Sequence, residues 1–159
     1  PRDRANLIGF NQLLTSVFSH NIAKQAAISA NSTYADSPMF VPENLLDGSP
    51  DTYWVSADDT TTSEIRLDFD HPVTFNLVEL REPLHLGQRI EGYALDVWKN
   101  DTWQSIYSAA MIGNRRLALI PEQNTTRVRL RITASAVCPA LTQFGLYMSN
   151  PLQSAWLPD

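Results

Sequence analysis

A short acidic turn at residues 47–52 has the residue types of a cation site. Asp47 and Thr52 flank a Gly-Ser-Pro-Asp segment. Hard cations such as Ca²⁺ need several oxygen ligands, and a glycine lets backbone carbonyls turn toward the Asp47 carboxylate and the Thr52 hydroxyl. The same residues suit an Asx turn, in which the carboxylate accepts hydrogen bonds from nearby backbone amides. The pattern leaves both interpretations open.

The other residues with reactive side chains do not form a catalytic pattern. The chain has no G-x-S-x-G or H-E-x-x-H motif and no glycine-rich phosphate loop, and His20, His71 and His85 lie in unrelated contexts. Asp58 and Asp59 are adjacent, so in an extended chain their side chains point to opposite sides and make a poor acid/base pair. We therefore predict no catalytic residues in this chain.

Three arginines, Arg127, Arg129 and Arg131, alternate along one predicted strand. They could grip an anionic ligand, but alternation alone produces the same pattern on a solvated sheet face. We therefore expect cross-strand carboxylate partners for them. Cys138 is the single cysteine, so no internal disulfide is possible, and we expect a small buried thiol.

Strands that could position these residues begin near residue 25, where apolar residues recur at every second position. Alternating runs lie at residues 65–69, 93–97 and 128–132, which predicts antiparallel strands with one face in a core and one in water. The 73–80 run changes phase, which predicts a bulge or burial on both faces. Turn signals occur at 47–50, 70–72, 99–101, 112–114 and 121–124. About eight short strands at this spacing predict an all-β sandwich or jelly roll.

One convincing helix is predicted, between Ala5 and Ile22. Its apolar residues follow the spacing of one helical face: Leu7, Phe10, Leu14, Val17, Phe18 and Ile22. The partner of this face is either the sandwich or a neighbouring domain outside the chain. We assign residues 1–24 to a connector helix, 25–150 to the sandwich and 151–159 to a C-terminal tail.

Composition argues against two classes of partner. The chain has 159 residues, which fits one domain, a net charge of −5 and only 18% charged residues, so it does not attract phosphate backbones and we expect no nucleic acid partner. We find no apolar run of about 18 residues and no signal peptide, so we expect no membrane segment. Because the chain starts abruptly at Pro1, we expect it to be a fragment of a longer protein. Sequons at Asn31, Asn100 and Asn124 weakly favour secretion.

Several segments together resemble a known family. LLDGSPDTYW, EIRLDFDHPVTFNLVELREPLHLGQRIEGYALDVW, NTTRVRLRIT and PALTQFGLYM are similar to the discoidin-like, or coagulation-factor type C, domain. FNLVELREPLHLGQRIEGYAL and the opening ANLIGFNQLLTSVFSHNIA further resemble the carboxy-terminal part of α-L-fucosidases. The resemblance implies a galactose-binding-like jelly roll that follows a catalytic barrel in a secreted, periplasmic or lysosomal glycosidase. It also implies that the paired carboxyl groups for hydrolysis belong to that barrel.

The resemblance bears on the metal site. Members of the family often hold a structural Ca²⁺ near the sandwich edge, with the acidic turn and an acidic residue on the last strand. Asp47 and Thr52 match the turn, and Gln143 stands where the last carboxylate is expected. These three residues could hold Ca²⁺, and the neutral amide weakens such a site.

The resemblance bears equally on the sugar site. Sugar-binding members place a histidine after the Trp of T-x-W and an arginine and an asparagine in the 81–89 loop, where this chain has Val55, Glu82 and Gly87. The usual galactose-type site is therefore expected to be missing.

Two interpretations of the loops remain. One is a saccharide site of aromatic faces and planar donors, contributed by Tyr34, Trp54, His85, Gln88 and Arg89. In the other, which we prefer, Trp54 fills the core and the three polar residues bind the catalytic barrel.

These observations predict a non-catalytic accessory domain of an α-L-fucosidase. Such a domain docks on the catalytic barrel and borders the glycan-binding cleft. The alternative is an autonomous lectin-like module for fucosylated or galactosylated glycans.

Overall fold

The computed structural model describes residues 2–149, so the predicted tail at 151–159 lies outside them. The helices are α1 (Arg2–Phe18) and four 3-10 helices, η1 (Ile22–Gln25), η2 (Tyr34–Asp36), η3 (Pro42–Leu46) and η4 (Leu84–Leu86). The strands are β1 (Ala27–Ala30), β2 (Trp54–Val55), β3 (Ser63–Arg81), β4 (Ile90–Lys99), β5 (Thr102–Ala109), β6 (Arg116–Ser135), β7 (Ala140–Leu141) and β8 (Gln143–Tyr147). Within this part of the chain, no helix is both long and apolar enough to span a membrane.

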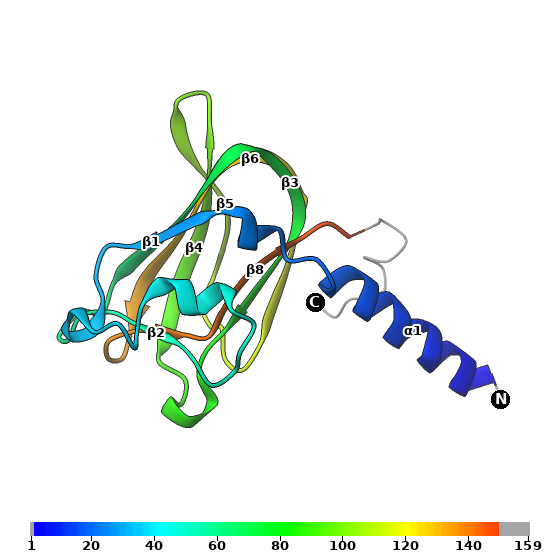
Figure 1. The fold of residues 1–159 in the computed structure, drawn as a ribbon, viewed down its shortest axis with the longest axis horizontal. Coiled ribbons are helices and arrows are strands. Elements are labelled where there is room, and N and C mark those ends of the chain that lie inside the picture. The colour runs from blue at the N-terminus through cyan, green and yellow to red at the C-terminus, as the bar shows by residue number, and fades with distance from the viewer. Residues whose placement is uncertain (1, 150–159) are drawn as a thin grey trace.

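Two long strands, β3 and β6, organise the sandwich. They pair antiparallel from Ser63 opposite Ile132 to Leu80 opposite Arg116, and both curve over the top of the molecule in Figure 1. Strands β1, β4 and β5 extend the sheet at one end of this ribbon, whereas β8 pairs with the other end of β3. The bent ribbon thus contributes to both layers, and all strand pairs are antiparallel, as the alternation predicts.

The turn predicted at residues 70–72 is wrong, because β3 continues through it. The register shifts between Asp68 and Val73, opposite Arg127 and Thr125. Pro72 lacks an N–H to donate, so it is tolerated where the ladder is interrupted and the ribbon bends. The signal at 121–124 is likewise inside β6. It lies at a second register shift, between Phe75 opposite Gln123 and Leu77 opposite Leu119. Both false turn signals therefore mark irregularities of the β3–β6 ladder and not chain reversals.

The predicted phase change in β3 is confirmed. A register shift lies between Phe75 and Leu77. After it, Val78 and Leu80 face the main core, whereas Leu77 is buried on the other face with Tyr147. This segment of β3 is therefore both bulged and buried on two sides.

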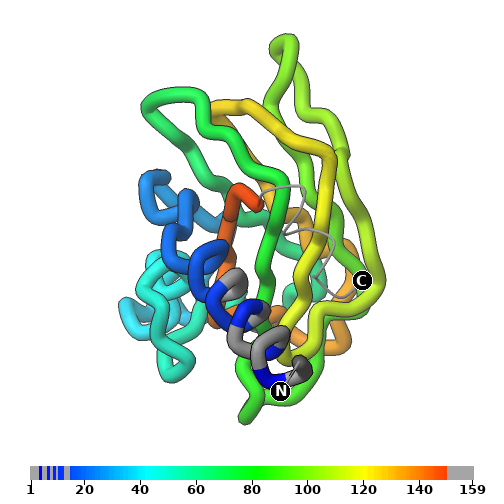
Figure 2. The backbone as a smooth tube through the Cα atoms, turned by 90° about the vertical axis from the view of Figure 1, so that its right-hand side faces the viewer, coloured from blue at the N-terminus to red at the C-terminus, as the bar shows by residue number. Residues whose placement is uncertain are grey.

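Helix α1 contacts the sandwich through its C-terminal end. Val17 is buried against Leu77 and Tyr147, and the Phe18 ring meets the Tyr147 ring edge-on at 4.8 Å. Leu7, by contrast, is 61% exposed. Figure 1 shows the helix projecting away from the sandwich, and Figure 2 views it from its N-terminal end, in front of the sandwich. The sandwich thus covers one end of the apolar stripe and leaves Leu7 open to a further partner.

The arginines of β6 have the carboxylate partners that the sequence predicts. Arg129 Nε and Arg131 Nε donate to Asp96 Oδ2 at 2.7 and 2.6 Å, and Arg127 pairs with Asp68 at 3.5 Å. Alternation placed Asp96 on the water face of β4, but this expectation is wrong, since Asp96 is only 1% exposed. The long arginine side chains cover it.

Candidate functional site

Four aromatic rings form a row at one end of the sandwich, and we call Tyr34, Phe40, Tyr53 and His85 the aromatic row. Centroid distances are 5.9 Å from Tyr34 to Phe40, 5.4 Å from Phe40 to Tyr53 and 5.1 Å from Tyr53 to His85. Tyr34 belongs to η2 and His85 to η4, and Phe40 precedes η3. These three short helices lie at the end of the sandwich opposite to the β3–β6 bend (Figure 1). The row therefore lies on the loops that connect the strands.

A side-chain clamp positions the middle of the row. Asn44 Nδ2 donates to the carbonyl of Met39 at 2.8 Å and to that of Tyr53 at 2.9 Å. The Val55 amide also donates to the Phe40 carbonyl at 3.4 Å. These bonds tie the segment that carries Phe40 to the one that carries Tyr53, so the two rings meet.

Two open hollows flank the row and share Phe40 and Tyr53. The first, of about 300 Å³, is lined by Tyr34, Phe40, Tyr53, Val55, Asp58, Leu86, Arg89 and Cys138. The second, of about 630 Å³, is lined by Pro38, Met39, Phe40, Asn44, Pro50, Asp51, Thr52, Tyr53 and His85. Shallow hollows with aromatic walls and a few polar groups suit the apolar face and the hydroxyls of a sugar ring.

The structure brings together three of the five residues predicted for sugar or inter-domain contact. Tyr34 and Arg89 line the smaller hollow and His85 the larger. Trp54 is fully buried, and its Nε1–H donates to the Ser32 carbonyl at 3.1 Å, so it fills the core.

Gln88 lies apart from the row. It lines another hollow with Glu82, Gly87 and Gly113. Its side chain therefore does not contribute to either hollow beside the aromatic row.

Arg89 is held in place by the neighbouring loop. Its Nη1 donates to the Cys138 carbonyl at 2.9 Å, and its own carbonyl accepts from the Ala136 amide at 2.8 Å. Cys138 was predicted to be buried, but it is half-buried at the wall of the smaller hollow. The reason is that its loop covers Arg89 and does not enter the core. Arg89 is half-buried and lines the smaller hollow.

A buried carboxylate, Glu82, shapes the loop that carries His85 and Arg89. Its Oε1 accepts from the amides of Arg89 and Ile90 at 2.8 and 2.9 Å, and its Oε2 accepts from the Gly113 amide at 2.8 Å. Glu82 is 4% exposed. In the sequence, Glu82 stands out only because it occupies the place of the arginine that the family resemblance implies. Its structural role could not be read from local pattern, because the three donors lie up to 31 residues away.

We expect Glu82→Gln to lower the free energy of unfolding by about 1–3 kcal/mol, because the amide turns an N–H group toward backbone donors. Chemical denaturation of the chain measures this loss. Glu91→Gln, at an exposed position of β4, is the matched control and should change stability by less than about 0.5 kcal/mol. Equal stability of the Glu82 variant and the wild type would contradict the assigned role.

The acidic turn closes on itself. Asp47 Oδ1 accepts from the Ser49 amide at 2.8 Å, and Asp47 Oδ2 accepts from the Thr52 hydroxyl. Gln143 lines a groove that Gly48, Ser49 and Pro50 of this turn also line, and there Lys24 Nζ comes within 3.9 Å of the position that a Cβ would occupy at Gly48. Among residues 2–149, no three His, Cys, Asp or Glu side chains are grouped to hold a metal ion.

One carboxylate, a neutral amide and a nearby ammonium group do not fit the preference of Ca²⁺ for several anionic oxygens. We propose that the 47–52 turn keeps its shape without metal. Adding millimolar Ca²⁺ should then leave the melting temperature within about 1 °C of its value in EDTA. Calorimetric melting tests this, with Mg²⁺ as the control, and a rise of several degrees with Ca²⁺ alone would restore the calcium interpretation.

Comparisons with known proteins relate the chain to enzymes and to binding modules. It is 32% identical over 145 residues to alpha-L-fucosidase 1 of Arabidopsis thaliana, covering 89% of this chain and 29% of that protein. A GH29 fucosidase of Ruminococcus gnavus in complex with fucose superposes with a TM-score of 0.85 at 23% identity, over 94% of this chain and 30% of that one.

A chitosan-binding module of Paenibacillus sp. IK-5 in complex with chitotriose is similar along almost its whole length. It gives a TM-score of 0.70 at 20% identity, over 80% of this chain and 99% of that module. The chain thus spans less than a third of the fucosidases but matches a complete module.

The family model confirms the fold and the resemblance. The F5/8 type C domain matches residues 27–143, which contain the strands from β1 to β7 and the whole aromatic row. Similarity to the fucosidases concerns their carboxy-terminal part. The predicted galactose-binding-like sandwich is therefore confirmed, and this chain belongs to the F5/8 type C domain family.

Proposed function

We propose that this chain is the non-catalytic accessory domain of an α-L-fucosidase. It docks on the catalytic domain and borders the glycan-binding cleft with its aromatic row. The observation that carries the proposal is the 32% identity to a segment that makes up only 29% of alpha-L-fucosidase 1. The remaining length of such an enzyme has room for the catalytic barrel.

The distribution of carboxylates near the aromatic row supports a non-catalytic role. Retaining glycosidases place two carboxyl groups about 5 Å apart across the scissile bond. Here Asp58 lines the smaller hollow and Asp51 the larger, so these two acids do not face one another across one hollow. The row is thus equipped to contact a sugar, and hydrolysis belongs to the neighbouring domain.

The N-terminal helix supports docking. It leads directly into the sandwich, and Leu7 exposes 61% of its surface. An apolar side chain on a projecting helix gains stability when a second domain covers it. The catalytic domain, as the preceding segment of such an enzyme, is the partner that we propose.

The test uses the longer fucosidase with Tyr53 replaced by alanine. Loss of one stacking face should raise KM for a fucosylated oligosaccharide about tenfold, which corresponds to roughly 1.4 kcal/mol. KM for an aryl fucoside, which is too short to reach the row, should stay unchanged. Tyr53→Phe keeps the ring and should behave as the wild type. Equal effects of Tyr53→Ala on both substrates would contradict the proposal.

A second candidate function is an autonomous lectin-like module. Two observations favour it. The similar chitosan-binding module was solved in complex with chitotriose, and Tyr34 and His85 are exposed in this chain. Calorimetric titration of the chain with fucose, galactose, lactose and fucosylated oligosaccharides separates the two. An accessory domain that forms only one wall of a cleft should bind these sugars too weakly to give saturable heat. A lectin should give saturable heat, and Tyr53→Ala should abolish it.

The secreted, periplasmic or lysosomal location stays a prediction. Among the sequons, Asn100 lies exposed at the tip of the β4–β5 hairpin with φ of 51°. The Asn31 side chain instead accepts from the Ser63 hydroxyl at 2.7 Å, and the Asn124 side chain donates to Thr74 at 2.9 Å. Asn100 is therefore the sequon that we propose for glycan attachment in a secretory compartment.

A further inference from the structure

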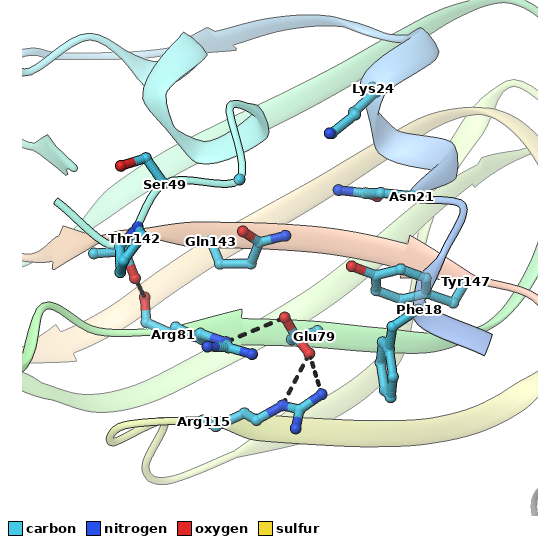
Figure 3. Close-up of a pocket in the computed structure, with 12 residues that line it drawn as sticks. Phe18, Asn21, Lys24, Ser49, Glu79, Arg81, Arg115, Thr142, Gln143 and Tyr147 are labelled. Atoms are coloured by element: carbon cyan, nitrogen blue, oxygen red, sulfur yellow. Dashed lines mark hydrogen bonds and ion pairs between the residues drawn. The ribbon is translucent and has the colours of Figure 1, made fainter. Parts of the chain in front are cut away.

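A polar groove lies on the outer face of β3 and β8. It adjoins the larger hollow beside the aromatic row, because Pro50 lines both. Figure 3 shows η1, the 48–50 loop and the side chains of β3 and β8 around it. Its volume is about 300 Å³, enough for one sugar ring. We call it the η1 groove, and it is lined by Phe18, Asn21, Lys24, Gly48, Ser49, Pro50, Glu79, Arg81, Arg115, Thr142, Gln143 and Tyr147.

The Asn21 amide offers the η1 groove a donor that has no acceptor. Its Oδ1 accepts from the amides of Ala23 and Leu146, both at 3.0 Å. Because both partners are backbone donors, the oxygen must face them and the NH₂ group must face away. Asn21 is 9% exposed and lines the groove, yet its Nδ2 has no partner within residues 2–149. A buried donor left unpaired costs stability, so this group indicates a missing acceptor.

The charges of the groove sum to an excess of two positive units. Glu79 is 3% exposed, and its Oε1 accepts from Arg81 at 3.2 Å while its Oε2 accepts from Arg115 at 2.7 Å. One carboxylate thus faces two guanidinium groups. Lys24 adds a third cation and forms no salt bridge in the described part of the chain. This local excess contrasts with the net charge of −5 of the whole chain.

Part of the remaining wall of the groove is aromatic. The rings of Phe18 and Tyr147 line it. Burial, together with the charge of Glu79, raises the pKa of Tyr147 to about 12, so its hydroxyl stays neutral. Tyr147 is only 4% exposed, so the half-buried Phe18 ring is the aromatic surface that the groove adds to its cations and its unpaired N–H donor.

We propose that the η1 groove binds a sugar that carries a carboxylate, such as a uronic acid. The carboxylate accepts from Asn21 Nδ2 and pairs with the Lys24 ammonium group, and the sugar ring occupies the rest of the groove. The choice of a sugar rests on the proposed function above, whereas the preference for a carboxylate rests on the groove itself. An ionised carboxylate only accepts hydrogen bonds, which matches a site with the unpaired donors of Asn21 and Lys24.

The test is an NMR titration of the ¹⁵N-labelled chain with sodium glucuronate. The Asn21 side-chain NH₂ resonances should shift saturably, and neutral glucose should not shift them at equal concentration. Acetate should move the same resonances at least about tenfold more weakly, because it lacks the ring. Chloride at equal ionic strength controls for screening.

Matched variants assign the binding to the groove. Lys24→Gln should weaken glucuronate binding about tenfold, whereas Lys99→Gln, which makes the same charge change on β4, should leave it unchanged. Asn21→Asp keeps an oxygen for the Ala23 and Leu146 amides but replaces the donor by a like charge, so it should abolish binding. Melting curves verify that each variant is folded.

Three results would overturn the inference: no saturable shift with glucuronate, equal binding of glucose, or wild-type affinity in Lys24→Gln. Tighter binding of a glutamate-rich peptide than of glucuronate would also overturn it, in favour of a protein partner. None of these outcomes touches the fucosidase proposal, which is decided by Tyr53 on the separate aromatic row.

Discussion

Replacing Trp54 by alanine is expected to lower the free energy of unfolding by about 3–5 kcal/mol. Trp54 is fully buried and belongs to the main core cluster, and its Nε1–H donates to the Ser32 carbonyl at 3.1 Å. The change removes the indole volume and leaves that carbonyl without its donor. The two strands that pair here, β2 and β7, are only two residues long, so the strand ladder itself compensates little for the lost packing.

Denaturant unfolding followed by circular dichroism measures the loss. Trp54→Phe retains most of the apolar surface and should lose roughly half as much stability. Trp103→Ala, at a half-buried position on β5, serves as the control for tryptophan removal and should cost less. A loss below about 1 kcal/mol at Trp54 would contradict its assigned role in the core.

The second large effect is expected at Asp96, which lies beneath Arg129 and Arg131. Asp96→Asn leaves two guanidinium groups without their carboxylate, and we expect it to cost about 3 kcal/mol. The carboxyl is 1% exposed and the Arg129 side chain 18% exposed, so water replaces the lost interaction poorly. Unfolding at neutral pH measures the difference.

The loss at Asp96 should also depend on pH. Burial by itself raises the pKa of Asp96, but hydrogen bonds from Arg131 and Arg129 and their charges outweigh burial and hold this pKa below 3.8. The unfolded chain therefore takes up this proton at a higher pH than the folded one. The stabilisation is fully present above about pH 4 and is lost as pH falls through the folded pKa. The difference between wild type and Asp96→Asn should accordingly shrink below about pH 4.

Asp68→Asn provides the control for a surface pair. Asp68 and Arg127 are both 47% exposed and 3.5 Å apart, so the variant should lose less than about 1 kcal/mol. A gap between wild type and Asp96→Asn that stays constant from pH 7 to acid unfolding would contradict the assigned ionisation of Asp96.

The regular parts of the sandwich follow from the sequence because they obey local rules. Apolar alternation locates the paired parts of β3, β4 and β6, and Asn100-Asp101 forms the predicted turn with φ of 51° and 57°. The bend at Pro72 does not follow, since a turn signal has the same composition whether the chain reverses or continues through a bulge. Only the pairing partner, Thr125, distinguishes the two.

The candidate site was only partly predictable for the same reason. The sequence predicts a role for Trp54 but not for its neighbour Tyr53. In an extended segment adjacent side chains point to opposite faces, so a buried Trp54 implies an outward-facing Tyr53. Phe40 enters the row through the Asn44 clamp, and Glu82 acts through amides distant in sequence. Such contacts carry no local signature, so sequence pattern alone does not find them.

The central claim is that the aromatic row serves an α-L-fucosidase without performing hydrolysis. Its most direct test compares kcat/KM of the longer enzyme, with and without Tyr53→Ala, on a fucosylated oligosaccharide and on an aryl fucoside. The account predicts about a tenfold loss on the oligosaccharide alone. Equal loss on both substrates, no loss on either, or release of aryl alcohol by this chain alone would contradict it.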